Sequence, residues 1–295
     1  MQAALPDWNH AIRGAKPQCA TAIRNIVLPL TGQETLPAIP VARKLCELYR
    51  ATLHVIYVGE GLSDLREQPA RFGLTAEDVR GAVFDQASGE PPAAVTRLAR
   101  ELPEMLIVMS TAAGQQNENN RFGSITESVF DAHPPRAVLV PPERGNVTWT
   151  LQRILLAHDG TPISDPATGP AADLAQRARA ELTALHVAAR GEERPAARGS
   201  IAAPLYVDQP HHEWPAWAEE FMKRVLAGGA PPSSVHFRLA VTGGQAGSEV
   251  AAAARERNAD LVVMAWHGHW DHKDCATRAV VRGAGCPVML VYSAG

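Results

Sequence analysis

The sequence is built from two similar halves. Three apolar segments recur in the same order: residues 24–32 as 153–160, 104–109 as 259–264, and 137–140 as 287–290. This repeat is far longer than the roughly 20 to 50 residues of a solenoid unit, so it indicates a duplicated domain. The second and third segments are separated from their repeats by more residues than the first segment is. The second copy therefore contains extra residues after its first segment.

The bulk composition limits the classes of protein that this chain can belong to. Its 295 residues fit two ordinary domains, and 46% apolar residues are enough for two cores. A charged fraction of 20% with net charge −3 argues against a nucleic-acid platform and against an acidic disordered chain. No run approaches the roughly 18 apolar residues of a membrane span, and the N-terminus lacks the apolar core of a signal peptide. We therefore expect a cytoplasmic protein with no membrane and no nucleic-acid partner.

The four cysteines, Cys19, Cys46, Cys275 and Cys286, form no CxxC pair and do not recur between the copies. This spacing favours free thiols in a reducing compartment. Cys46 and Cys286 lie in apolar periodic segments, where we expect them to fill core space.

Apolar runs predict strands, and apolar residues spaced by three and four predict helices. In the first copy the predicted strands are 26–30, 53–58, 81–84, 105–109 and 137–140, with helices over 39–49, after Pro91-Pro92 and from about Ser124. In the second copy the strands are 153–158, 182–187, 235–241, 260–265 and 287–292, with helices near 167–180, 214–227, 246–257 and 274–283. Alternating strands and helices predict parallel βαβ units, so each sheet is expected to be covered on both faces.

This pattern predicts the domain organisation. The expected parts are an N-terminal arm at 1–22, a first domain at 23–143, a linker at 144–151 and a second domain at 152–295. The second domain contains an insertion at about 190–213 that is rich in Pro, Arg and Gly. It is either a floppy insertion or a lid or partner-binding segment.

The loop after the fourth strand of the first copy has features of a phosphate site. Ligands of open parallel sheets bind beyond the carboxyl ends of the strands, where the strand order reverses. Gly123-Ser124 begins a helix there, and the free N–H groups and positive dipole end of a helix suit a phosphate. Arg121 adds positive charge. Taken alone, a Gly-Ser helix start is more often a plain N-cap.

Several motifs in order, in both halves, resemble the universal stress protein family. The first copy supplies 29–32, 105–109, Gly123-Ser124 and 137–140, and the second supplies 158–160, 260–264 and 286–290. The resemblance covers about 22–293. It implies an α/β protein with two tandem Rossmann-like (adenine nucleotide α-hydrolase-like) domains, each with a five-stranded parallel sheet flanked by helices. It also implies that the tandem domains form an intramolecular pseudo-dimer, with a homodimer of chains as a further possibility.

Some members of that family bind ATP through a Gly-x-x-Gly-x9-Gly-Ser/Thr loop and an Asp after the first strand. Carried onto the first copy, this resemblance implies a nucleotide site made by Pro29, Thr31, Gly32, Met109, Thr111, Gly114, Arg121, Gly123 and Ser124. The first copy departs from the pattern, because Thr31 replaces the Asp, Thr111 replaces the first Gly, and the spacer is one residue short.

The second copy keeps Asp159 and Gly160 but loses the phosphate loop. Asp274 and Cys275 stand where Gly-Ser belongs, and a carboxylate at that helix start would repel a triphosphate. We therefore expect this copy to be degenerate as an ATP site.

A histidine-rich segment of the second copy is a candidate zinc site. His267, His269, His272 and Asp274 are residue types that Zn²⁺ favours, although their spacing matches no familiar zinc pattern. A solvated loop is the alternative. His54 and His186 fall on predicted strands, where we expect structural histidines.

The resemblance to the universal stress protein family implies a cytoplasmic stress-response regulatory protein that binds ATP in its first domain and acts through protein partners not identified by the sequence. No Ser-His-Asp order, HExxH, P-loop or nucleophile elbow is present, so an enzyme is not expected. The alternatives are a weak ATPase, and a nucleotide-free scaffold or metal-binding protein that acts through partners.

Overall fold

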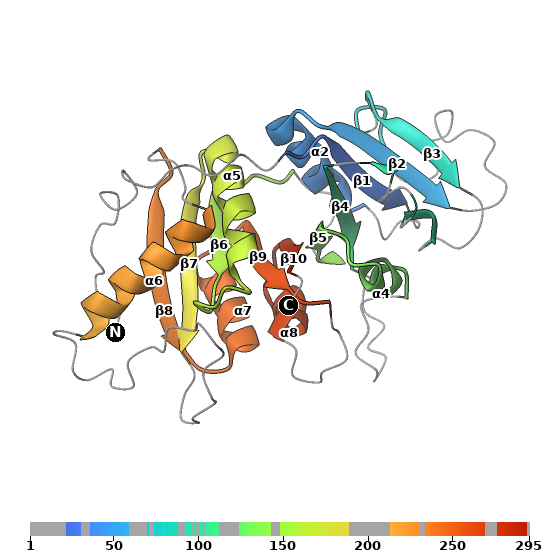
Figure 1. Cartoon of the computed structure of the whole chain (residues 1–295). Coiled ribbons are helices and arrows are strands. Elements are labelled where there is room, and N and C mark those ends of the chain that lie inside the picture. The colour runs from blue at the N-terminus through green and yellow to red at the C-terminus, as the bar shows by residue number, and fades with distance from the viewer. Residues whose placement is uncertain are drawn as a thin grey trace. The chain divides into compact units, whose positions relative to one another are not determined.

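The computed structural model describes most of both halves of the chain. The described residues are 22–30, 36–58, 70, 74–78, 80–87, 93–95, 97, 101–102, 104–111, 124–142, 148–188, 213–229, 234–268 and 276–293. They divide into two compact units, here called the N-terminal unit (Ala22–Thr150 with Gly285–Tyr292) and the C-terminal unit (mainly Leu151–Ala284). Figure 1 labels their helices and strands.

The N-terminal unit is a mostly parallel sheet in the order β3-β2-β1-β4-β5-β10. Its strands are β1 (Asn25–Leu30), β2 (Thr52–Val58), β3 (Val83–Ala87), β4 (Met105–Ser110), β5 (Arg136–Val140) and β10 (Val288–Tyr292). Among the described residues of this unit, helices with defined bounds are α2 (Ala38–Tyr49) and α4 (Ser124–Asp131). All the strand pairs are parallel except β5 with β10, which is antiparallel.

The C-terminal unit has the parallel strand order β9-β6-β7-β8. Its strands are β6 (Arg153–Ala157), β7 (Glu181–Ala188), β8 (Phe237–Gly243) and β9 (Leu261–Trp266). Its helices are η4 (Asp165–Ala167, a single 3₁₀ turn), α5 (Thr168–Ala178), α6 (Glu213–Gly229), α7 (Ala246–Glu256) and α8 (Ala276–Gly283). Helix α5 packs with α6, and α7 packs with α8 (Figure 1).

The central strands of both units are buried along nearly their whole length. In β9 every residue is buried, and in β4 only the last residue, Ser110, is partly exposed. A strand whose successive side chains are all buried has both faces covered, because those side chains point alternately to opposite faces of the sheet. Such strands leave only their ends for polar chemistry.

The strand and helix predictions within the described residues are confirmed, with shifts at a few ends. The helix predicted after Pro91-Pro92 lies largely outside the described residues. The third strand lies at Val83–Ala87 and not at 81–84. It is an edge strand with Val83 exposed, so its apolar pattern is weak. The antiparallel β5–β10 pair departs from the purely parallel sheet that we predicted, because the edge of β5 finds its backbone partner in a strand of opposite direction. Cys46 and Cys286 are free thiols in or near the core, as expected. Burial raises the pKa of the Cys46 thiol to about 12.

Within the described ranges, the model contains no helix with both the length and the apolar character that a membrane crossing requires.

Helices α7 and α8 approach each other closely at a glycine. A Cβ atom on Gly247 would lie 2.7 Å from the Cβ of Ala279 and 3.0 Å from the Cα of Ala276. Gly283 on α8 is similarly close to Ala251 of α7, at 2.9 Å. These contacts leave no room for a side chain at either glycine, so the spacing of the two helices depends on them.

We predict that Gly247→Ala destabilises the C-terminal unit by about 1–3 kcal/mol, because overpacking outweighs the gain in helix propensity. The neighbouring Ser248→Ala is the matched control, since Ser248 is exposed and its change is expected to stay within about 0.5 kcal/mol. Urea unfolding measures the free energy of unfolding of both variants. Equal stability of the two would show that the helices separate without cost.

Candidate functional site

The strand order of the N-terminal unit reverses at β1. Strand β2 pairs with one edge of β1 and β4 with the other, both in parallel. The chain therefore leaves the carboxyl end of β1 toward one side and that of β4 toward the other, which opens a crevice in sheets of this kind. The ends of these two strands, at Leu30 and Ser110, mark the edge where the sequence predicts a nucleotide.

The described members of the predicted site lie at this edge or directly beneath it. Pro29 is buried in β1 opposite Ile56 of β2, and Met109 of β4 is only 4% exposed. Both side chains belong to the core below the edge. Ser124 is the first residue of α4. The other predicted residues, Thr31, Gly32, Gly114, Arg121 and Gly123, lie outside the described residues.

Thr111 has a structural role at the end of β4. Its amide donates to the carbonyl oxygen of Val140 at 2.9 Å, and its hydroxyl donates to the same oxygen at 3.4 Å. The residue is buried. These bonds tie the end of β4 to the end of β5, so Thr111 anchors the strand edge.

Ser110 is a residue at this edge that sequence analysis did not select. Its hydroxyl oxygen is buried and has no hydrogen-bond partner among the described residues. Buried polar atoms are nearly always paired, so an unpaired one at a strand end is a candidate ligand contact. The sequence feature that could have identified Ser110 is its place as the single polar residue at the end of an otherwise apolar strand.

The predicted zinc site is only partly within the described chain. His267 is exposed directly after β9, whereas His269, His272 and Asp274 lie outside the described residues. No group of three or more His, Cys, Asp or Glu in the described ranges could hold a metal ion.

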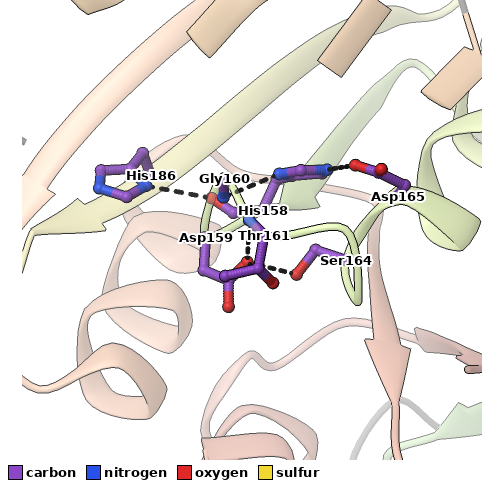
Figure 2. Close-up of polar contacts among 7 residues, drawn as sticks. All are labelled: His158, Asp159, Gly160, Thr161, Ser164, Asp165 and His186. Atoms are coloured by element: carbon purple, nitrogen blue, oxygen red, sulfur yellow. Dashed lines mark hydrogen bonds and ion pairs between the residues drawn. The ribbon is translucent and has the colours of Figure 1, made fainter. Parts of the chain in front are cut away.

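The corresponding edge of the C-terminal unit is a loop held by one carboxylate (Figure 2). Oδ1 of Asp159 accepts hydrogen bonds from the amide of Thr161 at 2.9 Å, the hydroxyl of Thr161 at 2.7 Å and the hydroxyl of Ser164 at 2.7 Å. Gly160 has a φ of +81°, a left-handed conformation that favours glycine. The loop therefore turns tightly around Asp159 on leaving β6.

His158 lies at the base of this loop with a fully buried side chain. Its Nδ1 accepts a hydrogen bond from the amide of Gly160 at 3.0 Å, so the proton of the neutral ring is on Nε2. Nε2 lies 3.3 Å from Oδ1 of Asp165, an approach too oblique for a good hydrogen bond. The signal for this residue was a histidine closing an apolar strand, and sequence analysis assigned it no role.

His186 on β7 and two aromatic residues of α6 close the cluster. Nδ1 of His186 lies 3.3 Å from the carbonyl oxygen of His158. The rings of Trp217 and Phe221 each lie 5.0 Å from the His186 ring, and Phe221 also meets His158 edge-on at 5.8 Å. Helix α6 thus packs an aromatic surface on both histidines. His54 of β2 is also held by a neighbouring strand, with Nε2 3.1 Å from Oδ1 of Asn25.

The ionisation of this cluster follows from burial and hydrogen bonding. Burial lowers the pKa of His158 and of His186, and this effect outweighs the nearby carboxylates that raise it. Burial would raise the pKa of Asp159, but the hydrogen bonds from Ser164 and Thr161 outweigh it and hold that pKa below its ordinary value. At neutral pH the cluster contains a charged Asp159 and two neutral imidazoles.

We predict that the protein loses stability as the pH falls below about 6.5, because the unfolded state then binds protons that His158 and His186 cannot bind when folded. His186→Phe removes one of these sites and retains an aromatic ring beside Trp217. As the pH is lowered below about 6.5, the free energy of unfolding of this variant should decrease less steeply than that of the wild type. The difference in slope should be up to about 1.4 kcal/mol per pH unit.

Urea unfolding at several pH values between about 5 and 7.5 measures this slope. Trp217→Phe is the control, because it perturbs the same cluster without removing a titratable group. It should lower stability at every pH and leave the slope unchanged. An unchanged slope in His186→Phe would contradict the buried, neutral state of His186.

Comparison with known proteins supports the fold and identifies one domain. Residues 150–292 match the model of the universal stress protein family. A universal stress protein from Archaeoglobus fulgidus superposes with a TM-score of 0.60 at 16% identity, over 91% of this chain and 98% of that one. A functionally unknown protein from Pseudomonas aeruginosa PAO1 superposes equally well, with a TM-score of 0.60 at 14% identity, over 92% and 94%.

A putative universal stress protein from Pseudomonas aeruginosa UCBPP-PA14 gives a TM-score of 0.58 at 14% identity, over 92% of this chain and 94% of that one. No curated protein matches at significant similarity. At these identities the solved structures establish the fold over both halves, and the family match establishes the second half. Residues 150–292 of this chain are therefore a domain of the universal stress protein family.

Proposed function

We propose that this protein is a cytoplasmic stress-response regulator of the universal stress protein type that binds ATP in its N-terminal unit. In this proposal the C-terminal unit is a copy that has lost nucleotide binding. The protein acts by binding a nucleotide and a protein partner, and not by turning over a substrate.

The observation that supports this proposal most directly is the position of β1 between β2 and β4. This arrangement creates the strand-order reversal at which nucleotides bind in open α/β sheets. The buried, unpaired hydroxyl of Ser110 lies at the same edge. An adenine nucleotide offers both donors and acceptors to such a hydroxyl.

Helix α4 supplies the second element of the proposed site. It follows β4 in the chain and precedes β5, which pairs in parallel with β4. In such a crossover the helix begins at the carboxyl edge of the sheet, so its N-terminus lies on the side where β4 ends. The unpaired N–H groups of its first turn, beginning at Ser124, can bind a phosphate.

The arrangement of Asp159 supports loss of binding in the C-terminal unit. In the family pattern the Asp after the first strand contacts the nucleotide. Here Oδ1 of that residue accepts three hydrogen bonds from its own loop. A ligand would have to compete with donors that are already in place, so we assign Asp159 a structural role.

We predict that calorimetric titration of ATP and Mg²⁺ into ligand-stripped protein gives one site per chain. Gly123→Asp should abolish the binding, because it places a negative charge at the start of α4, where the phosphates would bind. Asp159→Asn is the matched control in the other copy, and it should leave the affinity for ATP unchanged.

Three other outcomes would each contradict part of this proposal. Binding that Asp159→Asn abolishes and Gly123→Asp retains would place the site in the C-terminal unit and overturn the assignment. No heat and no thermal shift in the wild type would overturn nucleotide binding altogether and favour a scaffold that acts through protein contacts. Formation of ADP in proportion to the amount of bound ATP would show that the protein hydrolyses ATP. That result would contradict the proposed non-enzymatic role.

A further inference from the structure

The C-terminal unit contains a cavity at the opposite end of its sheet from the Asp159 loop. This cavity lies where β6, β7 and β8 begin, beside the residues that follow α7, and has a volume of about 230 Å³. It is lined by three arginines, Arg153, Arg238 and Arg257, with Glu181, Thr183 and Leu155 among the other lining residues. The proposed nucleotide site in the other unit does not involve this cavity.

The strand register explains how these residues meet. Arg153 of β6 lies opposite Glu181 of β7, two residues before the paired Leu155 and Thr183. Thr183 in turn lies opposite Arg238 of β8. Paired residues of adjacent parallel strands, and residues two apart in one strand, share a face of the sheet. The cavity therefore has an apolar and hydroxyl floor with arginines around it.

The three arginines differ in how they are held. Nη1 of Arg238 lies 2.9 Å from Oε1 of Glu181, and its Nε donates to Nε2 of His236 at 2.9 Å. Arg238 is thereby fixed from two sides. The guanidinium groups of Arg153 and Arg257 have no ion pair or hydrogen bond with another residue in the described part of the chain. Within the described part of the chain, two planar, charged donor groups are thus left without a partner at the cavity.

The charge and size of the cavity define a ligand class. Three arginines and one glutamate leave an excess of two positive charges among its lining residues. Guanidinium groups bind carboxylates and phosphates through paired, charge-assisted hydrogen bonds. The volume of about 230 Å³ is below the roughly 300–1,000 Å³ of pockets for drug-sized ligands, so the cavity can enclose only a small ligand.

We propose that this cavity binds a small organic dianion whose phosphate or carboxylate group is held by Arg153 and Arg257. The Thr183 hydroxyl, on a residue only 8% exposed, supplies a further hydrogen bond from the floor. Arg238, fixed by Glu181 and His236, adds positive charge without having to be ordered by the ligand. The site would let the C-terminal unit sense a small metabolite.

Calorimetric titrations of the full chain with glycerol 3-phosphate and with succinate, at matched ionic strength, test this proposal. We expect saturable binding of at least one probe, and the stronger one identifies the head group as phosphate or carboxylate. Arg153→Gln should weaken it about tenfold or more, because it removes a charge-assisted contact. Arg153→Lys retains the positive charge and loses the paired donors of the guanidinium group. Its affinity for the probe should therefore lie between those of the wild type and Arg153→Gln.

Lys223→Gln is the matched control, because it removes the same charge from an exposed position on α6. Arg257→Gln is the second test, accompanied by thermal unfolding without probe, because a cation after α7 also offsets the negative end of the helix dipole. The proposal is overturned if the wild type binds neither probe at millimolar concentration, or if Arg153→Gln binds as tightly as the wild type. It is also overturned if Lys223→Gln weakens binding as much as Arg153→Gln, because the effect would then be one of net charge.

Discussion

The structure depends on central strands that are buried on both faces. Strands β4 and β9 are apolar along almost their whole length, and helices must cover both sides of such strands to keep them from water. In these two strands the polar side-chain groups are confined to the strand ends. The chemistry of this protein is therefore a matter of what each strand end presents: Ser110 and Thr111 in one unit, and the Asp159 loop and the arginine-lined cavity in the other.

The sequence was sufficient to predict the main elements because their patterns are strong. The apolar runs that became β1, β6 and β9 are bounded by polar residues, and the stripes of α2 and α7 have helical spacing. The predicted bounds of the edge strand β3 were shifted from the observed ones, because an exposed edge strand has no continuous apolar run. The antiparallel pairing of β5 with β10 could not be predicted, because strand direction depends on which edges meet and not on local composition.

The sites were less predictable than the fold. The residue types after β6 were visible in the sequence, but the commitment of the Asp159 carboxylate to Thr161 and Ser164 is a matter of loop geometry. The arginine-lined cavity leaves no sequence signature, since Arg153 and Arg257 are far apart in the chain and are brought together by strand order. The family match and the predicted nucleotide loop also fall in different halves, so family membership and ligand binding must be argued separately.

The pairing of β5 with β10 affects how the chain is made. Strand β10 follows the whole of Leu151–Ala284 in the sequence, yet it packs within the N-terminal unit. During synthesis the first unit of a multidomain protein usually folds before the second has emerged. Here the edge of β5 stays unpaired until the C-terminal unit and β10 have been synthesised, and the long intervening segment must close as a loop before that edge is paired. Until then the first half has an unpaired strand edge, which is the kind of surface through which partly folded chains associate.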